Sequence, residues 1–189
     1  MMSPQEQLER YEAVLRSWSE RINLIGPEAK RHLRDHIDEA REAGARLQPT
    51  GKCLDFGSGG GLPAVPMAID HSDARFTLVE ADQKKWAFLK HVARECALNV
   101  LVLGDRLERL LDDGRLDGPY RFVTSRAVGY PERWLPLLAP SLEEGARIAL
   151  FEHAGEPPEV GGFETEEVVP LSRGTNNYLI ILRKTTEAR

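Results

Sequence analysis

The chain has 189 residues, of which 41% are hydrophobic and 29% charged, and its formal net charge is −5 at pH 7. This composition predicts one globular domain, and it excludes a membrane span because no stretch approaches about 18 consecutive apolar residues. The two cysteines give no disulfide framework or metal-ligand spacing, and the N-terminus lacks the features of a signal peptide, so we expect a cytoplasmic protein without membrane contact or bound metal.

Two helices are predicted at the N-terminal end. Apolar residues recur at spacings of three and four within residues 5–21, which is typical of an amphipathic helix that packs on a core. After a break at residues 23–27, a helix over residues 28–47 carries charges of alternating sign, typical of a solvated face. We expect residues 1–48 to form a helical extension packed on a core domain of residues 49–189.

A short apolar strand over residues 52–56 runs into a glycine-rich turn with Asp55 two residues before its first glycine. Glycine has no Cβ atom, so the backbone can approach a ligand closely and adopt positive φ. Pro63 stands where a helix would begin, and this position tolerates proline because its missing N–H would be unpaired anyway. The pattern predicts a nucleotide-type cofactor at the first strand-to-helix turn of an α/β sheet.

The spacing of the glycines separates two kinds of cofactor. The dinucleotide pattern G-x-G-x-x-G, counted from Gly57 and Gly59, needs a third glycine where Leu62 stands, which disfavours an NAD-dependent oxidoreductase. An acid before the glycines suits a cofactor with a positive amino group, so we predict S-adenosylmethionine, with Asp55 near its methionyl amine. The alternative is a turn that only packs a helix on a strand. The predicted cofactor-binding residues of the turn are Gly57, Ser58, Gly59, Gly61, Leu62 and Pro63.

Two further strands end in polar residues that should reach the same edge of the sheet. A strand over residues 76–80 ends in Glu80, about 20 residues past the glycine turn, where nucleotide-binding α/β folds place an acid on the ribose hydroxyls. The strand over residues 100–103 is followed by Gly104 and Asp105. Ligands of open α/β sheets bind outside the carboxyl ends of the strands. Glu80 is the predicted ribose ligand, and a solvated acid at a strand end is the alternative.

The rest of the chain completes the pattern. Strands alternate with helices, which predicts a parallel sheet covered by helices on both faces. Two strands near the C-terminus suit an antiparallel closure of the sheet edge, so we predict a mostly parallel sheet of seven strands. The further helices are expected from residue 63 and over residues 83–97, 107–111 and 130–138, and the further strands over residues 121–125, 146–151, 167–171 and 178–183.

Several segments, in order, resemble one protein family. The block of residues 55–69, with glycines followed by paired prolines, resembles the bacterial 16S ribosomal RNA guanine-N7 methyltransferase family RsmG, also called glucose-inhibited division protein B. Asn23-Leu24 is similar to an upstream Asn-Leu of the family. The family also has a histidine in this region, which corresponds to His32 or His36, and the distances along the chain from Asn23 and to Asp55 favour His36. The downstream matches are Glu80 with Lys84, Lys85, Phe88 and Leu89, then Asp105-Arg106-Leu107-Glu108, and then Thr124-Ser125-Arg126-Ala127-Val128.

The resemblance implies a Rossmann-like class I methyltransferase fold and transfer of a methyl group from S-adenosylmethionine to guanine N7 in the 530 loop of 16S rRNA. It implies a partner, 16S rRNA or the small ribosomal subunit, and we expect a monomer. Because N7 has a lone pair and no proton, the reaction needs positioning and electrostatic fit rather than a general base. Arg126 is predicted to face the target nucleotide and the cofactor, and a structural arginine paired with a helix carboxylate is the alternative. The residues implied at the adenine side of the cofactor are Asp105, Arg106, Leu107 and Glu108.

The chain departs from the family pattern at positions expected to face RNA. Glu152 stands where the family has a lysine, and Asn176-Asn177 stand where it has Arg-His. Arg121 replaces an acid that is usual in the family. Phosphate contacts come from Lys and Arg, so these changes and the negative net charge leave two alternatives open. One is a diverged methyltransferase acting on another RNA or a small molecule, and the other is a ribosome-associated module that binds the cofactor without turnover.

Overall fold

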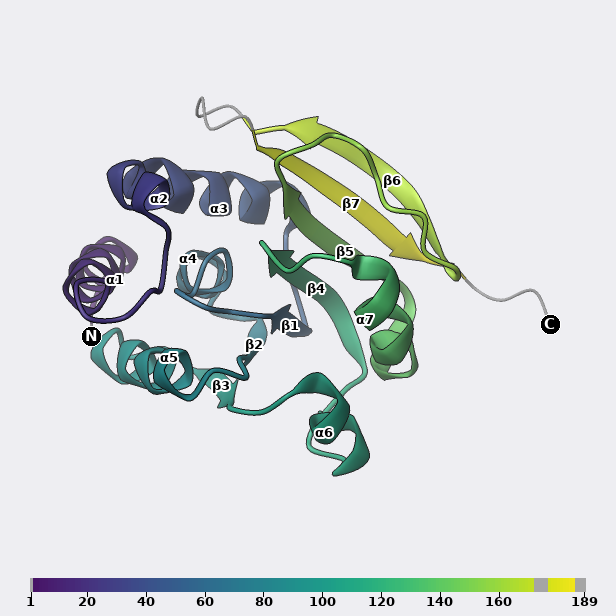
Figure 1. Ribbon diagram of the computed structural model, residues 1–189, viewed down its shortest axis with the longest axis horizontal. Coiled ribbons are helices and arrows are strands. Elements are labelled where there is room, and N and C mark those ends of the chain that lie inside the picture. The colour runs from purple at the N-terminus through teal and green to yellow at the C-terminus, as the bar shows by residue number, and fades with distance from the viewer. Residues whose placement is uncertain (1, 172–176, 186–189) are drawn as a thin grey trace.

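The computed structural model describes residues 2–171 and 177–185. Seven strands form one sheet in the order β3-β2-β1-β4-β5-β7-β6 (Figure 1). The pairs from β3 to β5 are parallel, and β7 is antiparallel to both β5 and β6. This confirms the predicted mostly parallel sheet of seven strands. The strands are β1 (Lys52–Phe56), β2 (Arg75–Val79), β3 (Val100–Leu103), β4 (Tyr120–Arg126), β5 (Leu142–Glu152), β6 (Phe163–Pro170) and β7 (Tyr178–Lys184).

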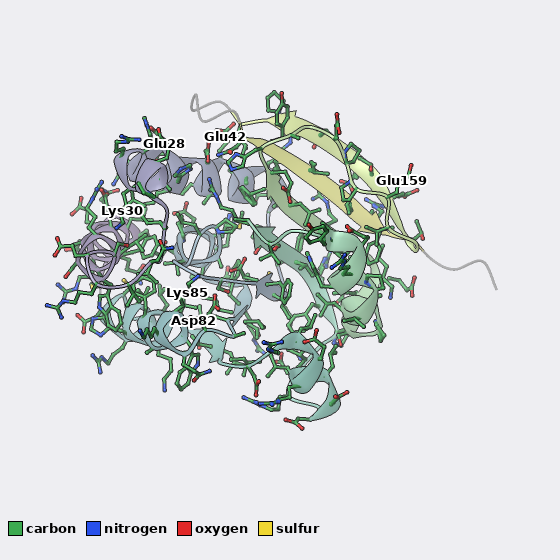
Figure 2. All side chains as sticks on the ribbon, viewed as in Figure 1. Glu28, Lys30, Glu42, Asp82, Lys85 and Glu159 are labelled. Atoms are coloured by element: carbon green, nitrogen blue, oxygen red, sulfur yellow. The ribbon has the colours of Figure 1, made fainter. Side chains whose placement is uncertain are left out.

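Helices lie on both faces of the sheet (Figure 2). They cover both faces because successive side chains of a strand point to opposite faces and each face needs a partner. One core lies between the sheet and helices α1, α3, α4 and α5, and the other between the sheet and helices α6 and α7. In β1, for example, Cys53 belongs to the first core and Leu54 to the second. The helices are α1 (Pro4–Trp18), α2 (Pro27–Arg31), α3 (Leu33–Leu47), α4 (Ala64–Asp70), α5 (Gln83–Glu95), α6 (Leu107–Asp112) and α7 (Pro131–Leu138).

The N-terminal helices share the core of the sheet. Leu8, Tyr11 and Leu15 of α1 are buried in the same cluster as side chains of α4 and α5. The Tyr11 hydroxyl donates a hydrogen bond to the carbonyl of Gly60, at 2.8 Å, and so ties α1 to the glycine turn. Helix α1 therefore helps to hold the connection between β1 and α4 in place.

Three predicted elements differ clearly from those observed, one of them β6, which begins at Phe163 instead of residue 167. The single helix expected over residues 28–47 is divided at His32, whose φ of −107° and ψ of 26° lie outside the helical region. Strand β5 begins at Leu142, earlier than predicted, and its pairing with β4 shifts register close to Gly145, which has φ of 71°. A β-bulge of this kind interrupts the alternation on which the sequence prediction depends. None of the described helices is both long and apolar enough to cross a bilayer.

Candidate functional site

The glycine turn leaves the carboxyl end of β1 and is fixed to β2 by backbone hydrogen bonds. The N–H groups of Gly57 and Ser58 both donate to the carbonyl of Val79 at 3.0 Å. Gly57, Gly59 and Gly61 have φ values of 74°, 51° and 87°, a region that favours glycine. The local fold therefore requires glycine at these three alternate positions.

The three glycines differ in what a side chain would meet. A Cβ atom on Gly57 would overlap Val128 Cγ2, and one on Gly61 would lie 2.7 Å from Val65 Cγ2. Neighbouring side chains of the protein therefore leave no room for a side chain at Gly57 or Gly61. On Gly59 the nearest atom to a Cβ would be the Gly57 carbonyl oxygen, at 3.7 Å. The space beside Gly59 is open.

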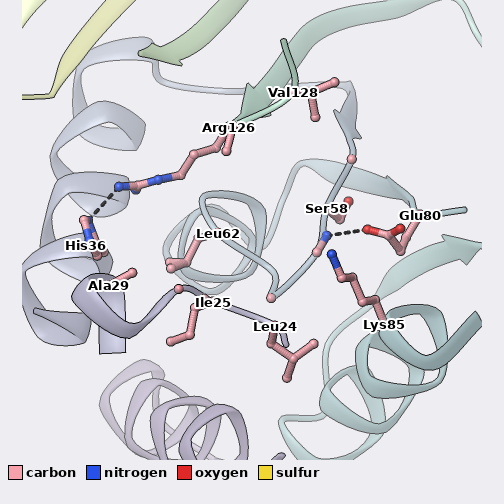
Figure 3. A pocket seen from close by; sticks show the side chains of 15 residues that line it. Leu24, Ile25, Ala29, His36, Ser58, Leu62, Glu80, Lys85, Arg126 and Val128 are labelled. Atoms are coloured by element: carbon pink, nitrogen blue, oxygen red, sulfur yellow. Dashed lines mark hydrogen bonds between the residues drawn. The ribbon is translucent and has the colours of Figure 1, made fainter. Parts of the chain in front are cut away.

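A pocket of about 400 Å³ includes Gly59 in its wall (Figure 3). It lies among the glycine turn, the ends of β2 and β4, and the segment that runs from α1 to α3. Six predicted site residues line it, namely Gly57, Ser58, Gly59, Leu62, Glu80 and Arg126. The other lining residues are Leu24, Ile25, Gly26, Ala29, His36, Gly60, Lys85, Ala127 and Val128.

Glu80 reaches the pocket just after the end of β2 (Figure 3). Its Oε2 accepts a hydrogen bond from Gly59 N and its Oε1 one from Asp82 N, both at 2.8 Å. A carboxylate has about four acceptor sites, so Glu80 can hold the turn against β2 and still accept hydrogen bonds from ligand hydroxyls. This geometry is compatible with the ribose role, which stays a prediction.

Asp55 is buried on β1 beneath the turn, with 1% of its surface exposed, and is not among the pocket-lining residues. Its Oδ1 accepts a hydrogen bond from the Thr124 hydroxyl at 2.6 Å, whereas its Oδ2 has no partner among the described residues. Burial raises the pKa of Asp55 to about 7, because the charged form loses its hydration. The protein thus leaves one oxygen of this carboxyl unpaired.

Arg126 extends from the end of β4 to α3 at the pocket wall (Figure 3). Its Nη2 lies 2.6 Å from His36 Nδ1 and 3.2 Å from Glu39 Oε2. Glu39 is fully buried and also accepts a hydrogen bond from Asn177 Nδ2, at 3.1 Å. A buried carboxylate needs such partners, since an isolated one is strongly disfavoured. The pairing with a helix carboxylate that the sequence left open is present, and Arg126 lines the pocket as well.

The departures from the family pattern lie in different surroundings. Asn177 is 3% exposed and donates to Glu39, so its assignment as an RNA-facing position is wrong: its amide serves a buried carboxylate. Glu152 ends β5 opposite Tyr178 of β7, and partial burial raises its pKa. Glu152 does not line the pocket, and its effect on RNA binding stays a prediction. Asn176 lies outside the described residues.

The remaining predicted cofactor-binding residues do not line the pocket. Gly61 and Pro63 are buried behind the turn. Asp105 pairs with Arg115 at 3.1 Å, and Leu107 is buried in the core beneath α6. Arg106 and Glu108 flank Leu107 at the exposed start of α6. Their assignment to the adenine side of the cofactor stays a prediction.

The pocket wall also contains residues that the sequence did not identify. Ile25, Gly26 and Ala29 come from the connection after α1 and from α2. They are small or isolated apolar residues without a recognisable motif, so the sequence carries no signal for them. His36 and Lys85 belonged to segments of family resemblance, and the structure places both at the pocket.

A second hollow, the basic cleft, adjoins the pocket and shares Lys85 with it. It has a volume of about 400 Å³. Its charged residues are Arg21, Lys84, Lys85 and Asp82, and its other lining residues are Ile22 and Asn23. In the part of the chain that the structure describes, neither Arg21 nor Lys84 forms a salt bridge, and no three His, Cys, Asp or Glu side chains gather as a metal site.

Solved structures of similar fold define the class of protein. A variant of MtNAS in complex with S-adenosylmethionine superposes with a TM-score of 0.63 at 19% identity, covering 95% of this chain and 72% of that one. The putative methyltransferase YhhF from Escherichia coli gives a TM-score of 0.59 at 20% identity, covering 79% and 88%. These likenesses concern the fold alone, which is the Rossmann-like class I methyltransferase fold predicted from the sequence.

The chain belongs to the rRNA small subunit methyltransferase G family, whose model matches residues 4–160. It is 38% identical over 156 residues to ribosomal RNA small subunit methyltransferase G of Sorangium cellulosum, covering 79% of this chain and 62% of that protein. It is 34% identical over 191 residues to the protein of the same name from Roseiflexus castenholzii, covering 88% of this chain and 82% of that protein. It is 43% identical over 109 residues to the protein of the same name from Cereibacter sphaeroides, covering 54% of this chain and 52% of that protein. The family resemblance of the sequence is thereby confirmed.

Proposed function

We propose that the protein transfers a methyl group from S-adenosylmethionine to small-subunit ribosomal RNA, at N7 of a guanosine in the 530 loop of 16S rRNA. The observation that supports this most is the pocket beside Gly59, at the carboxyl ends of β1, β2 and β4, in a chain of the methyltransferase G family. Ligands of open α/β sheets bind at this edge.

The residues around the pocket suit S-adenosylmethionine, which supplies a methyl group activated by a sulfonium. The open space beside Gly59 lets a ligand approach the backbone closely. Glu80 has acceptor sites left for ribose hydroxyls. The unpaired Oδ2 of Asp55 beneath the turn suits the positive methionyl amine, whose charge would favour the ionised carboxyl.

The chain contributes positioning to the chemistry. Guanine N7 carries a lone pair and no proton, so no side chain has to remove one. Leu24, Ile25 and Leu62 form an apolar part of the pocket wall and exclude water from the reacting atoms. Arg126 and His36 offer polar groups at the pocket wall, where a base can be oriented (Figure 3).

The basic cleft explains how an acidic protein can bind RNA. The net charge of −5 would repel a polyanion at long range. The cleft nevertheless brings together Arg21, Lys84 and Lys85 against the single carboxylate of Asp82. Asp82 is also engaged in capping α5 through the backbone N–H groups of Lys84 and Lys85, at 2.9 and 3.0 Å. We propose that a backbone phosphate next to the target nucleotide lies in this cleft.

Methyl-group incorporation tests the function directly. Small ribosomal subunits from a strain that lacks the 530-loop methylation are incubated with the protein and S-adenosylmethionine labelled in its methyl group, and the modified base is mapped. We expect label on one guanine N7, and no incorporation into subunits that already carry the methylation. Label on another base or on a small molecule would indicate a diverged methyltransferase. Cofactor binding without incorporation would indicate a module without turnover.

A further inference from the structure

His36 is the only histidine among the described residues that line the pocket. It lies on α3 and is 8% exposed. Two groups approach its Nδ1 atom. Arg126 Nη2 lies 2.6 Å away (Figure 3), and Glu39 Oε2 lies 3.1 Å away. One of these neighbours is a hydrogen-bond donor and the other an acceptor, so they make opposite demands on the protonation of Nδ1.

The distances decide between the two demands. A guanidinium nitrogen can only donate a hydrogen bond. If Nδ1 carried a proton, two N–H donors would face each other at 2.6 Å, a distance at which one of the two atoms has to be an acceptor. Glu39 does not need the imidazole as a donor, because Arg126 and Asn177 already donate to it at 3.2 and 3.1 Å. Nδ1 therefore accepts from Arg126, and the neutral ring carries its proton on Nε2.

The Nε2 atom is available to a ligand. It forms no hydrogen bond with any described residue, and it is not among the buried polar atoms that lack a partner. His36 therefore presents an accessible N–H group at the pocket wall. A donor at this place distinguishes the purines, because guanine has the acceptor O6 beside N7 whereas adenine has an amino group there.

We propose that Arg126 fixes His36 in its Nε2–H tautomer, and that this N–H donates a hydrogen bond to O6 of the guanine whose N7 is methylated. His36 is then a specificity-determining residue, and Arg126 is a positioning residue that acts through it. This proposal rests on the proposed function for its substrate. The tautomer itself does not depend on any activity and can be measured alone.

The first experiment is ¹⁵N NMR of the full chain labelled in histidine, with the His36 signals assigned by their loss in His36→Gln. At pH 7.5 we expect an unprotonated Nδ1 and a protonated Nε2 on His36. His32, which is exposed and lies 3.2 Å from Asp35 through its Nδ1, gives the comparison within the same spectrum. A protonated Nδ1, or a charged ring, would overturn the proposal whatever the protein methylates.

The second experiment compares two substitutions of the same residue. The amide nitrogen of a glutamine reaches about as far as Nε2 of histidine, whereas that of an asparagine reaches only as far as Nδ1. We therefore expect His36→Asn to lower kcat/KM for the RNA at least tenfold and His36→Gln to lower it much less. His32→Asn is the matched control and should change kcat/KM by less than about twofold, since exposed substitutions far from such features are nearly neutral. Equal losses in His36→Asn and His36→Gln would contradict a role for the Nε2–H group.

The target base provides the matching change on the RNA. Placing 2-aminopurine at the target position retains N7 and removes O6. The parent protein should methylate this RNA at least tenfold less efficiently than the guanosine RNA, and His36→Asn should show little difference between the two. An undiminished preference for guanosine in His36→Asn would show that another group recognises O6. If the parent methylates neither RNA, the proposed function fails, while the NMR result on the tautomer still stands.

Discussion

Two buried carboxyl groups, Glu39 on α3 and Asp55 on β1, lie in opposite situations. Glu39 accepts hydrogen bonds from Arg126 and Asn177, so its charge is satisfied by the protein. The Asp55 carboxyl accepts one hydrogen bond, from Thr124, and its second oxygen has no partner among the described residues. Described residues donate to both oxygens of the Glu39 carboxyl, but to only one oxygen of the Asp55 carboxyl.

The comparison distinguishes a buried carboxyl group that stabilises the fold from one that is suited to bind a ligand. A carboxylate whose partners come from two other parts of the chain holds them to its own element, and here Arg126 of β4 and Asn177, just before β7, are held to α3. Burial raises the pKa of the Asp55 carboxyl to about 7, and a cation beside its unpaired oxygen would favour the ionised form. Changes at Glu39 and its partners should therefore affect stability, whereas changes at Asp55 should affect cofactor binding.

Removal of a Glu39 partner should have the largest effect. Arg126→Ala leaves a buried carboxylate without its cation, and removing one member of a buried pair costs about 3–5 kcal/mol of unfolding free energy. Arg41→Ala is the control, because Arg41 forms an exposed pair with Asp70, Nε to Oδ2 2.7 Å, and such pairs contribute at most about 1 kcal/mol. Urea unfolding measures both. Equal losses for the two arginines would remove the distinction between the two carboxyls.

Replacement of Asp55 should act mainly on the cofactor. Asp55→Asn keeps an acceptor for Thr124 but removes the carboxyl charge, so affinity for S-adenosylmethionine at pH 8 should fall at least tenfold, about 1.4 kcal/mol. In the parent, affinity should rise as the pH increases through about 7, because the amine binds the ionised carboxyl and binding releases a proton. Calorimetry in buffers of different ionisation enthalpy detects that proton. Proton release that persists in Asp55→Asn would assign it to another group.

The same raised pKa has a consequence for the ligand-free protein. The Asp55 carboxyl ionises at its ordinary pKa of 3.8 in the unfolded chain and at about 7 in the folded one. Between these two values the unfolded state is ionised and the folded state is not, so the free energy of unfolding should fall as the pH rises from about 4 to about 7. Urea unfolding at a series of pH values measures this fall. Asp55→Asn should show a smaller fall over this range than the parent.

A substitution in the glycine turn should lower cofactor affinity by less than the replacement of Asp55. Gly59→Ala forces an alanine to φ of 51°, which costs about 1–2 kcal/mol of stability, and it places a methyl group in the pocket. Gly51→Ala is the control, because Gly51 has φ of 69° and open surroundings at the other end of β1. Both variants should lose similar stability, and only Gly59→Ala should lose cofactor affinity. Unchanged affinity in Gly59→Ala would place the cofactor elsewhere.

The smallest effect is expected in the basic cleft. Lys84→Ala should weaken binding of small-subunit RNA and reduce the slope of log affinity against log salt by about one unit, because one phosphate fewer is neutralised. Arg75→Ala removes an exposed cation at the amino end of β2, away from the strand ends that form the pocket. Its effect on the slope should be near zero. A similar change in both variants would mean that net charge, and not the cleft, governs RNA binding.

The sequence predicts the parts of the site that lie close together along the chain. The bounds of β1 and β3 agree with the prediction, because short apolar runs end at glycines there. The same signal brought Glu80 and the glycine turn to one edge of the sheet. The division of the charged helix at His32 was missed, because the alternating charges continue across it.

The partners of Glu39 could not be found in this way. Asn177 is separated from Glu39 by 138 positions, and the two meet only because β7 lies beside β5 in the sheet. No local pattern records that strand order. The sequence prediction placed Asn177 on the RNA-facing side because it stands where the resembled family has a basic residue, and that comparison does not show whether the position is buried.

The hydrogen bond between Asn177 and Glu39 has a consequence for the order of events during protein synthesis. The family match ends at residue 160, before β6 and β7, so a nascent chain of that length already contains Arg126, His36 and the glycine turn. It still lacks the amide that serves Glu39 and strand β7, which lies between β5 and the edge strand β6. A chain still being translated therefore contains every residue that lines the pocket, while the buried carboxylate that pairs with Arg126 still lacks its hydrogen bond from Asn177. The buried hydrogen bonds around Glu39 are complete only after Asn177 has been translated.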